Sequence, residues 1–235
     1  MNELNKVLII QNDPPETLGL YEKYLGENSE LTVLHAYDMR TKDVFPPLQQ
    51  YTHFIIGPTP ISANDALNHD FLRKEWSYLE DIIESKKPCL GVCCGAQILS
   101  KIQGGNVKKS PSKEIGCYTT TLTPEGLNDP LFKGFPEKFP VFHWHSDMFT
   151  LPSNGELLAT GDPCPIQGYR KDNVWGVIFH LEIIVEDAER WAFAYPNEPK
   201  AIGKTRKQVL EECRLYEDKM RVLAEKLMKN FLQQK

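Results

Sequence analysis

The chain lacks a long hydrophobic run, an excess of positive charge and a regular cysteine framework. Its 235 residues carry 27 Lys and Arg against 32 Asp and Glu, a formal net charge of -5, so no nucleic-acid surface is expected. The apolar stretch 7–10 is too short for a secretory signal or a membrane span. Six unevenly spaced cysteines without a Cys-x-x-Cys pair predict neither disulfides nor a metal site. We therefore expect a cytoplasmic protein without a membrane partner, metal or cofactor.

What is present is the composition and pattern of a globular α/β protein. Hydrophobic residues make up 41% of the chain and charged residues 25%, which is ordinary for one domain of this length. Apolar runs at 7–11, 31–37 and 53–56 alternate with helical patterns, one expected from Asn12–Pro15 onward and one from Asp70. This alternation predicts a mostly parallel central sheet with helices on both faces. Short strands after Gly105 predict antiparallel additions to that sheet.

The pattern of the C-terminal part predicts a helix from Thr205 onward, with a capping box formed by Thr205 and Gln208. A single straight helix of that length would run roughly 45 Å at 1.5 Å per residue, so a break is expected. We predict that residues 1–235 form one domain, on which residues 201–235 pack as a helical extension.

A strand, a sharp turn and a helix meet at two adjacent cysteines. Residues 89–92 are short and apolar, as in a buried strand, and a helical pattern begins at position 96. At such a bend the two backbones pass closely, so the residues two before and two after the nucleophile must be small. Cys93 has Gly91 and Gly95 there, whereas Cys94 would have larger neighbours. We predict Cys93 as the nucleophile and the Cys94 backbone N–H as a donor toward it; the alternative is two packed, inert cysteines.

The nucleophile needs a base, and His180 is the best placed of the six histidines. It closes the predicted strand 174–180, and Glu182 follows two residues later. If the strand continues, the two side chains share a face. A carboxylate there can fix the imidazole tautomer and raise its basicity. We predict Cys93, His180 and Glu182 as nucleophile, base and orienting group; the alternative is a pair at a strand end without chemistry.

Together these motifs resemble the class I (triad) glutamine amidotransferase family. Two signatures match, Gly-x-Cys-x-Gly-x-Gln at Gly91, Cys93, Gly95 and Gln97, and Phe-His-Pro-Glu at 179–182 with Leu181 in place of Pro. Segments 114–116 and 143–152 resemble a stand-alone branch related to the glutaminase domain of GMP synthetase. The resemblance covers about residues 7–191 and implies a flavodoxin-like fold.

The resemblance also implies a reaction and its site. Cys93 would attack the side-chain amide of glutamine, His180 would protonate the leaving ammonia, and water would hydrolyse the γ-glutamyl thioester to glutamate. The oxyanion would be held by the backbone N–H groups of Gly57 and Cys94. The α-amino and α-carboxylate ends of glutamine would be bound at three further positions, Gln97, Ser146 and Asp147.

Several functions stay open at this point. The sequence contains no recognisable ammonia-using domain and no Gly-rich phosphate loop with Lys. The chain would therefore work with a separate synthetase subunit or alone on a small-molecule substrate. The alternatives are a γ-glutamyl peptidase or hydrolase acting on a larger conjugate, a non-catalytic regulatory homologue, and a cysteine hydrolase with an unrelated acyl substrate.

Overall fold

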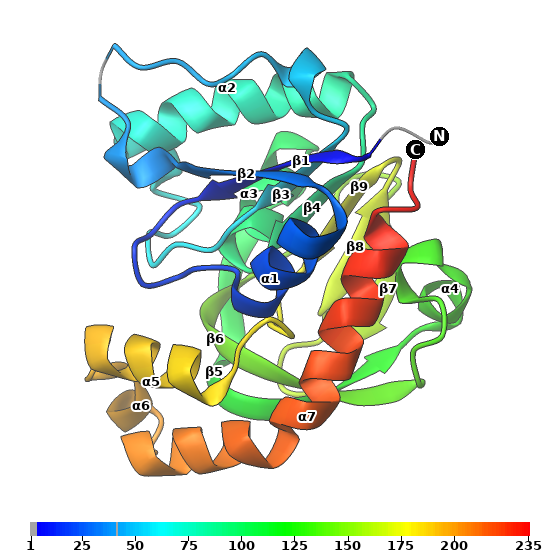
Figure 1. Cartoon of the computed structure of the whole chain (residues 1–235). Helices are drawn as coiled ribbons and strands as arrows, with labels where there is room; N and C mark the ends of the chain where they lie inside the picture. Colours follow the sequence, from blue (N-terminus) through cyan, green and yellow to red (C-terminus); the bar gives the residue numbers. More distant parts are fainter. Residues whose placement is uncertain (1–3, 41) are drawn as a thin grey trace.

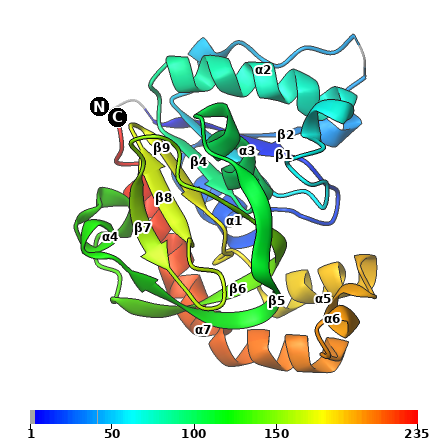
Figure 2. The same ribbon diagram turned by 180° about the vertical axis from the view of Figure 1, so that it is seen from behind.

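The computed structural model describes residues 4–40 and 42–235, and one mixed sheet runs through them (Figures 1 and 2). Its strand order is β2-β1-β3-β4-β9-β8-β7-β5-β6. The parallel half contains β1 (Lys6–Gln11), β2 (Glu30–His35), β3 (His53–Ile56), β4 (Cys89–Val92) and β9 (Val174–Val177). The antiparallel half contains β5 (Val107–Leu122), β6 (Lys138–Phe149), β7 (Glu156–Thr160) and β8 (Gly168–Lys171). The predicted α/β fold with antiparallel additions is confirmed.

Helices cover both faces of the parallel half because its central strands are apolar at almost every position. In β1, Val7 and Ile9 face one core, while Leu8 and Ile10 face the other. The first core receives α1 (Gly19–Asn28), α5 (Val185–Ala194) and α7 (Arg206–Phe231). The second receives α2 (Asp70–Glu84) and α3 (Cys94–Ile102). Two short helices, α4 (Pro124–Asn128) and α6 (Glu198–Ala201), contribute no residue to either core.

The segment before α1 differs from the prediction. Pro14 and Pro15 do not start the helix, which begins only at Gly19. The backbone instead stays in a loop that α5 and the residue after it hold in place. The Trp191 indole N–H donates to the Pro15 carbonyl (2.9 Å), and the Tyr195 hydroxyl donates to Asp13 Oδ2 (2.6 Å). These tertiary contacts outweigh the local preference for a helix start and bring the loop 12–18 to the carboxyl ends of the strands.

The C-terminal helix α7 is continuous over 26 residues. The expected break is therefore wrong, but the helix changes direction along its length in both views (Figures 1 and 2). The predicted capping box of Thr205 and Gln208 is present. Buried side chains of α7, among them Val209 and Phe231, belong to the same core as β1 and α1. This packing supports a single domain with a packed extension, which stays a prediction. None of the described helices has the length and apolar composition needed to cross a membrane.

The strand–turn–helix between β4 and α3 depends on its two glycines. A Cβ atom built on Gly95 would lie 2.3 Å from the Ile56 carbonyl oxygen, and one on Gly91 would lie 2.6 Å from the Ala96 nitrogen. Both obstacles are backbone atoms of packed elements, so they cannot move aside cheaply. The requirement for small residues two before and two after Cys93 therefore has a direct steric basis.

We expect Gly95→Ala to lower the free energy of unfolding by roughly 1–3 kcal/mol, because an added methyl group must displace packed backbone. Gly26→Ala in α1 is the matched control, since its Cβ would meet only Leu31 at 3.9 Å. That variant should be neutral or more stable by up to about 1 kcal/mol. Urea denaturation of both variants checks this, and a Gly95→Ala protein as stable as the unsubstituted chain would refute the steric explanation.

Candidate active site

Cys93 occupies the turn between β4 and α3 in a conformation that side chains rarely adopt. Its φ is 51° and its ψ is -110°, a combination far from the usual left-handed region at about φ +57° and ψ +47°, and backbone outliers of this kind cluster at functional sites. The turn is fixed on both sides. The Cys93 N–H donates to the Val177 carbonyl (2.8 Å), and its own carbonyl accepts from the Gln97 N–H (3.1 Å). The predicted sharp bend at Cys93 is thus present in the structure.

A cavity of about 190 Å³ opens beside this turn. Its lining includes most of the residues predicted to form the site, namely Cys93, Cys94, Gln97, Ser146, Asp147 and His180. Three elements of the fold meet there: the β4–α3 turn, strand β6 and the segment after β9. The cavity thus lies at the carboxyl end of the parallel strands, where ligands bind in open α/β sheets.

His180 and Glu182 form a short, fully buried hydrogen bond behind the cavity. His180 Nδ1 lies 2.5 Å from Glu182 Oε1, and neither side chain is exposed. With Glu182 ionised, the carboxylate can only accept, so Nδ1 carries the hydrogen and the lone pair of a neutral ring is at Nε2. His180 Nε2 has no hydrogen-bond partner among the described residues. The arrangement leaves one basic nitrogen available on a side chain that lines the cavity.

The structure holds His180 differently from the prediction. Strand β9 ends at Val177, so His180 and Glu182 do not share the face of a continuing strand. His180 instead makes an isolated antiparallel bridge with Phe142 of β6, in which each N–H donates to the other carbonyl (2.8 and 2.9 Å). The Trp191 ring packs edge-on against the imidazole at 4.9 Å between ring centroids. These contacts fix the orientation of the imidazole, although strand β9 does not continue to His180.

Burial holds the Cys93 thiol in its protonated form. Desolvation raises the pKa of Cys93 well above its usual range, and the nearby Cys94 and Glu16 side chains raise it further. The Cys94 backbone N–H at the start of α3 acts in the opposite direction as a hydrogen-bond donor to the sulfur. A nucleophilic thiolate at this position would therefore require a base that takes the proton as the sulfur reacts.

The expected role of Gly57 in an oxyanion hole conflicts with this conformation. The Gly57 N–H donates to the Ile10 carbonyl at 2.8 Å, so it is engaged between β3 and β1 and is not free to bind a ligand. The Gly57 carbonyl in turn accepts from the Asn12 side-chain amide (3.4 Å), which also donates to Glu75 Oε1 (3.0 Å). Of the two predicted donors, only the Cys94 N–H faces the sulfur.

The three predicted substrate contacts have different surroundings. The Gln97 side chain donates to the Asp147 backbone carbonyl (3.1 Å), which braces α3 against β6. The Asp147 carboxylate contacts Lys109 Nζ (2.6 Å) and accepts from the Ser62 hydroxyl (2.9 Å). Asp147 is thus already paired, and Gln97 is committed to the backbone, while both line the cavity together with Ser146.

Several residues of the cavity wall could not be identified as site residues from any local pattern in the sequence. Glu16, Trp144 and Tyr195 line it, and burial raises the pKa of Glu16 to about 8. An ion pair between Lys113 and Glu198 also lies at the cavity. These residues come from loops and elements far apart in the chain, and only the tertiary fold brings them together.

Comparisons with known proteins agree with this architecture. The sequence matches the family model for glutamine amidotransferase class-I over residues 20–193. It is 29% identical over 188 residues to the glutamine amidotransferase-like protein YfeJ of Salmonella typhimurium, covering 78% of each chain. It is 36% identical over 175 residues to the glutamine-hydrolyzing GMP synthase of Phocaeicola vulgatus, covering 68% of this chain but 32% of that protein. A crystal structure of a glutamine amidotransferase from Thermotoga maritima superposes with a TM-score of 0.90 at 26% identity, covering 99% of this chain and 100% of the other.

The buried carboxyl of Glu75 should make stability fall with rising pH. Burial raises its pKa from 4.5 to about 8 in the folded protein, so between these values the unfolded chain has lost a proton that the folded chain keeps. The free energy of unfolding should therefore decrease from about pH 4.5 to about pH 8, by at most ~1.4 kcal/mol per pH unit. Glu75→Gln should flatten this slope in urea denaturation, while Glu84→Gln, a change at an exposed residue at the end of the same helix, should not. Equal slopes for Glu75→Gln and the unsubstituted chain would contradict this.

Proposed function

Because the chain belongs to the class I glutamine amidotransferase family, we propose that it hydrolyses the side-chain amide of glutamine through a γ-glutamyl thioester on Cys93. One observation carries the proposal. The strained turn at Cys93 and the His180 ring with its buried Glu182 partner come from distant parts of the sequence, yet they meet at the wall of one cavity. Such a combination of a nucleophile, a base and an orienting carboxylate is the arrangement that acyl transfer requires.

In the proposed reaction the Cys93 proton passes to His180 Nε2 as the sulfur attacks the amide carbonyl. The hydrogen bond from Nδ1 to Glu182 stabilises the imidazolium that forms. His180 then returns the proton to the amide nitrogen, the carbon–nitrogen bond breaks, and ammonia leaves a γ-glutamyl thioester. Water attacks the thioester with His180 as base, which gives glutamate and restores the thiol. This concerted activation suits a thiol whose pKa is raised by burial.

The Cys94 N–H is the oxyanion donor that the geometry supports best, because it lies at the N-terminus of α3 beside the sulfur. A donor of this kind contributes on the order of 3 kcal/mol to the transition state. Gly57 could add a second donor only after its N–H leaves the Ile10 carbonyl. Ser146 and Asp147 are proposed to contact the amino-acid end of the substrate, and Gln97 to brace the Asp147 backbone.

The acceptor of the ammonia is a separate question. Several relatives are GMP synthases or one subunit of a GMP synthase, as in Pyrococcus abyssi, where 34% identity covers 45% of this chain and 56% of that one. This similarity supports a separate synthetase partner. The second candidate is hydrolysis of a larger γ-glutamyl conjugate, favoured by the continuation of the cavity wall to Trp144, Tyr195 and Glu198. The predicted cytoplasmic location stays a prediction.

The adjacent cysteines allow a matched test of the nucleophile. We expect Cys93→Ala to abolish ammonia release from L-glutamine, because no other side chain would form the thioester. Cys94→Ala should keep activity within roughly tenfold, since only its backbone N–H is used and its thiol contacts the Ile61 carbonyl (3.3 Å). Ammonia release by the purified chain, with circular dichroism to verify folding, is the measurement.

Two other results would change the proposal in different ways. If Cys94→Ala loses activity and Cys93→Ala keeps it, the assignment of the nucleophile is wrong. If the folded, unsubstituted chain releases no ammonia from glutamine but does cleave a γ-glutamyl amide or peptide in a Cys93-dependent manner, the larger conjugate is the substrate class. Absence of both activities would favour a non-catalytic homologue.

A further inference from the structure

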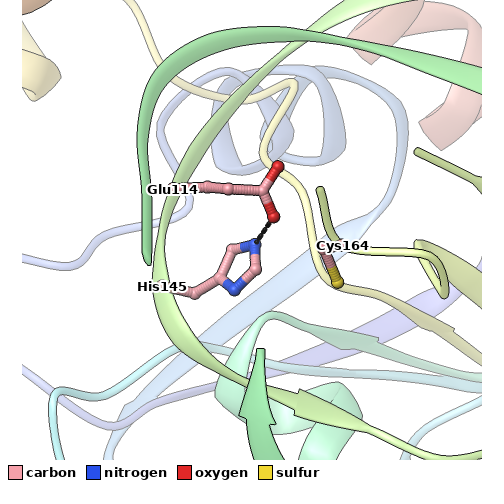
Figure 3. A group of neighbouring side chains, drawn as sticks. All are labelled: Glu114, His145 and Cys164. Atoms are coloured by element: carbon pink, nitrogen blue, oxygen red, sulfur yellow. Dashed lines mark ion pairs between the residues drawn. The ribbon is translucent and has the colours of Figure 1, made fainter. Parts of the chain in front are cut away.

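A second cluster of reactive side chains adjoins the cavity, and one of its members, His145, also lines the cavity. Glu114 belongs to β5, His145 to β6 and Cys164 to the loop between β7 and β8. One ligand atom from each lies within 4.8 Å of the other two, and all three side chains are buried. Figure 3 shows the Glu114 carboxylate and the His145 ring facing each other, with Cys164 beside them. The mechanism proposed for Cys93 uses none of these side chains directly.

The fold presents the three residues to one another. Glu114 and His145 are directly opposite in the antiparallel pairing of β5 and β6, just after the register shift that follows Lys109. Opposite residues point to the same side of the sheet. Cys164 is held from the loop side, where its carbonyl accepts from the Gln167 amide at 3.1 Å. The cluster is therefore built by three backbone segments, each with its own anchor.

The tautomer of His145 follows from its other contact. Nδ1 lies 3.0 Å from the Asp147 backbone carbonyl, and a carbonyl can only accept, so Nδ1 carries a hydrogen. In the neutral ring this leaves the lone pair at Nε2, which lies 3.2 Å from Glu114 Oε2. A lone pair and a carboxylate oxygen repel at this distance unless a proton or a cation lies between them.

Several buried polar atoms at this place have no hydrogen-bond partner among the described residues. They include both Glu114 carboxylate oxygens and His145 Nε2. The His143 ring is fully buried and lies 4.9 Å from that of His145 between centroids. Each unpaired buried group costs about 1–3 kcal/mol, so a concentration of them points to an ion as their common partner.

We propose that Glu114, His145 and Cys164 bind a divalent transition-metal ion, with Zn²⁺ as the best match. Imidazole, carboxylate and thiolate are its usual protein ligands. The 3.2 Å separation of His145 Nε2 and Glu114 Oε2 is long for a charge-assisted hydrogen bond. It is close to the roughly 3.4 Å that separates two ligands of a tetrahedral ion with bonds of about 2.0–2.1 Å. A water molecule or His143 would take the fourth position.

Charge and outer contacts also suit a cation. One carboxylate and one thiolate neutralise a divalent ion, which lowers the cost of burying it. The Nδ1–H contact of His145 with a backbone carbonyl is the typical outer hydrogen bond of a metal-bound imidazole. On binding, the Cys164 sulfur forms a bond to the ion and its proton is released to solvent.

The ion would act as a structural clamp. It would tie β5, β6 and the loop before β8 together behind the segment that carries Ser146 and Asp147 at the cavity. Spacing along the sequence could not predict it, because its three ligands are far apart in the chain and follow no metal-binding motif. The proposal does not depend on the amide hydrolysis proposed for Cys93.

Cobalt binding tests the site without an activity assay. The full chain, freed of metal with a chelator, is titrated with Co²⁺, and the thiolate-to-cobalt absorption in the near ultraviolet is recorded. We expect about one Co²⁺ per chain with this band, displaced by Zn²⁺. Cys164→Ser should remove the band. Cys93→Ala and Cys213→Ser should keep it, which excludes the reactive cysteine and a buried cysteine on α7 as the source.

Two further measurements keep the test decisive. Zn²⁺ should raise the melting temperature of the unsubstituted chain, and Glu114→Gln should weaken Zn²⁺ binding by roughly 10–100-fold or more while retaining the circular dichroism of the folded protein. A chain that gives no stoichiometric cobalt band, a band that survives Cys164→Ser, or a band lost only in Cys93→Ala would overturn the proposal. Any of these results would mean that a proton held between His145 Nε2 and Glu114 Oε2, and not a metal ion, accounts for their contact.

Discussion

The close approach of α3 to β3 is the constraint on which the rest of the site depends. Gly95 brings the first turn of α3 against the Ile56 carbonyl, at a distance that no side chain could tolerate. This approach forces Cys93 into its positive-φ turn and directs the start of α3 at the sulfur. Because the turn is also bonded to Val177 of β9, Cys93 is fixed by three neighbouring strands of the sheet rather than by a flexible loop.

The two halves of the sheet supply different parts of the site. The parallel half provides Cys93, and the antiparallel half reaches across to hold His180 through the Phe142 bridge and to present Ser146 and Asp147 from β6. Strand β6 also carries His145, so one strand links the cavity to the proposed metal cluster. The antiparallel strands therefore help to build the site, since they hold His180 and one wall of the cavity.

Local patterns could predict the features that local sterics and chemistry determine. Glycine spacing indicated the turn at Cys93, and the short interval between His180 and Glu182 indicated their contact, although a bridge to β6 and not a strand produces it. The pattern at Asn12–Pro15 wrongly predicts a helix start, because contacts from α5 decide the path of this loop. The engaged N–H of Gly57 and the cluster at Glu114 depend on pairings between distant segments, which no spacing in one sequence reveals.

The central claim is that a γ-glutamyl thioester forms on Cys93, and rapid quenching in acid followed by mass spectrometry tests it most directly. The chain is mixed with glutamine, quenched within milliseconds to seconds, digested at low pH and mapped by fragmentation. We expect a γ-glutamyl group on Cys93 that is absent without substrate. A γ-glutamyl group on Cys94 would contradict the claim. So would the absence of any adduct on the unsubstituted chain at every quench time, together with steady ammonia release by the Cys93→Ala variant.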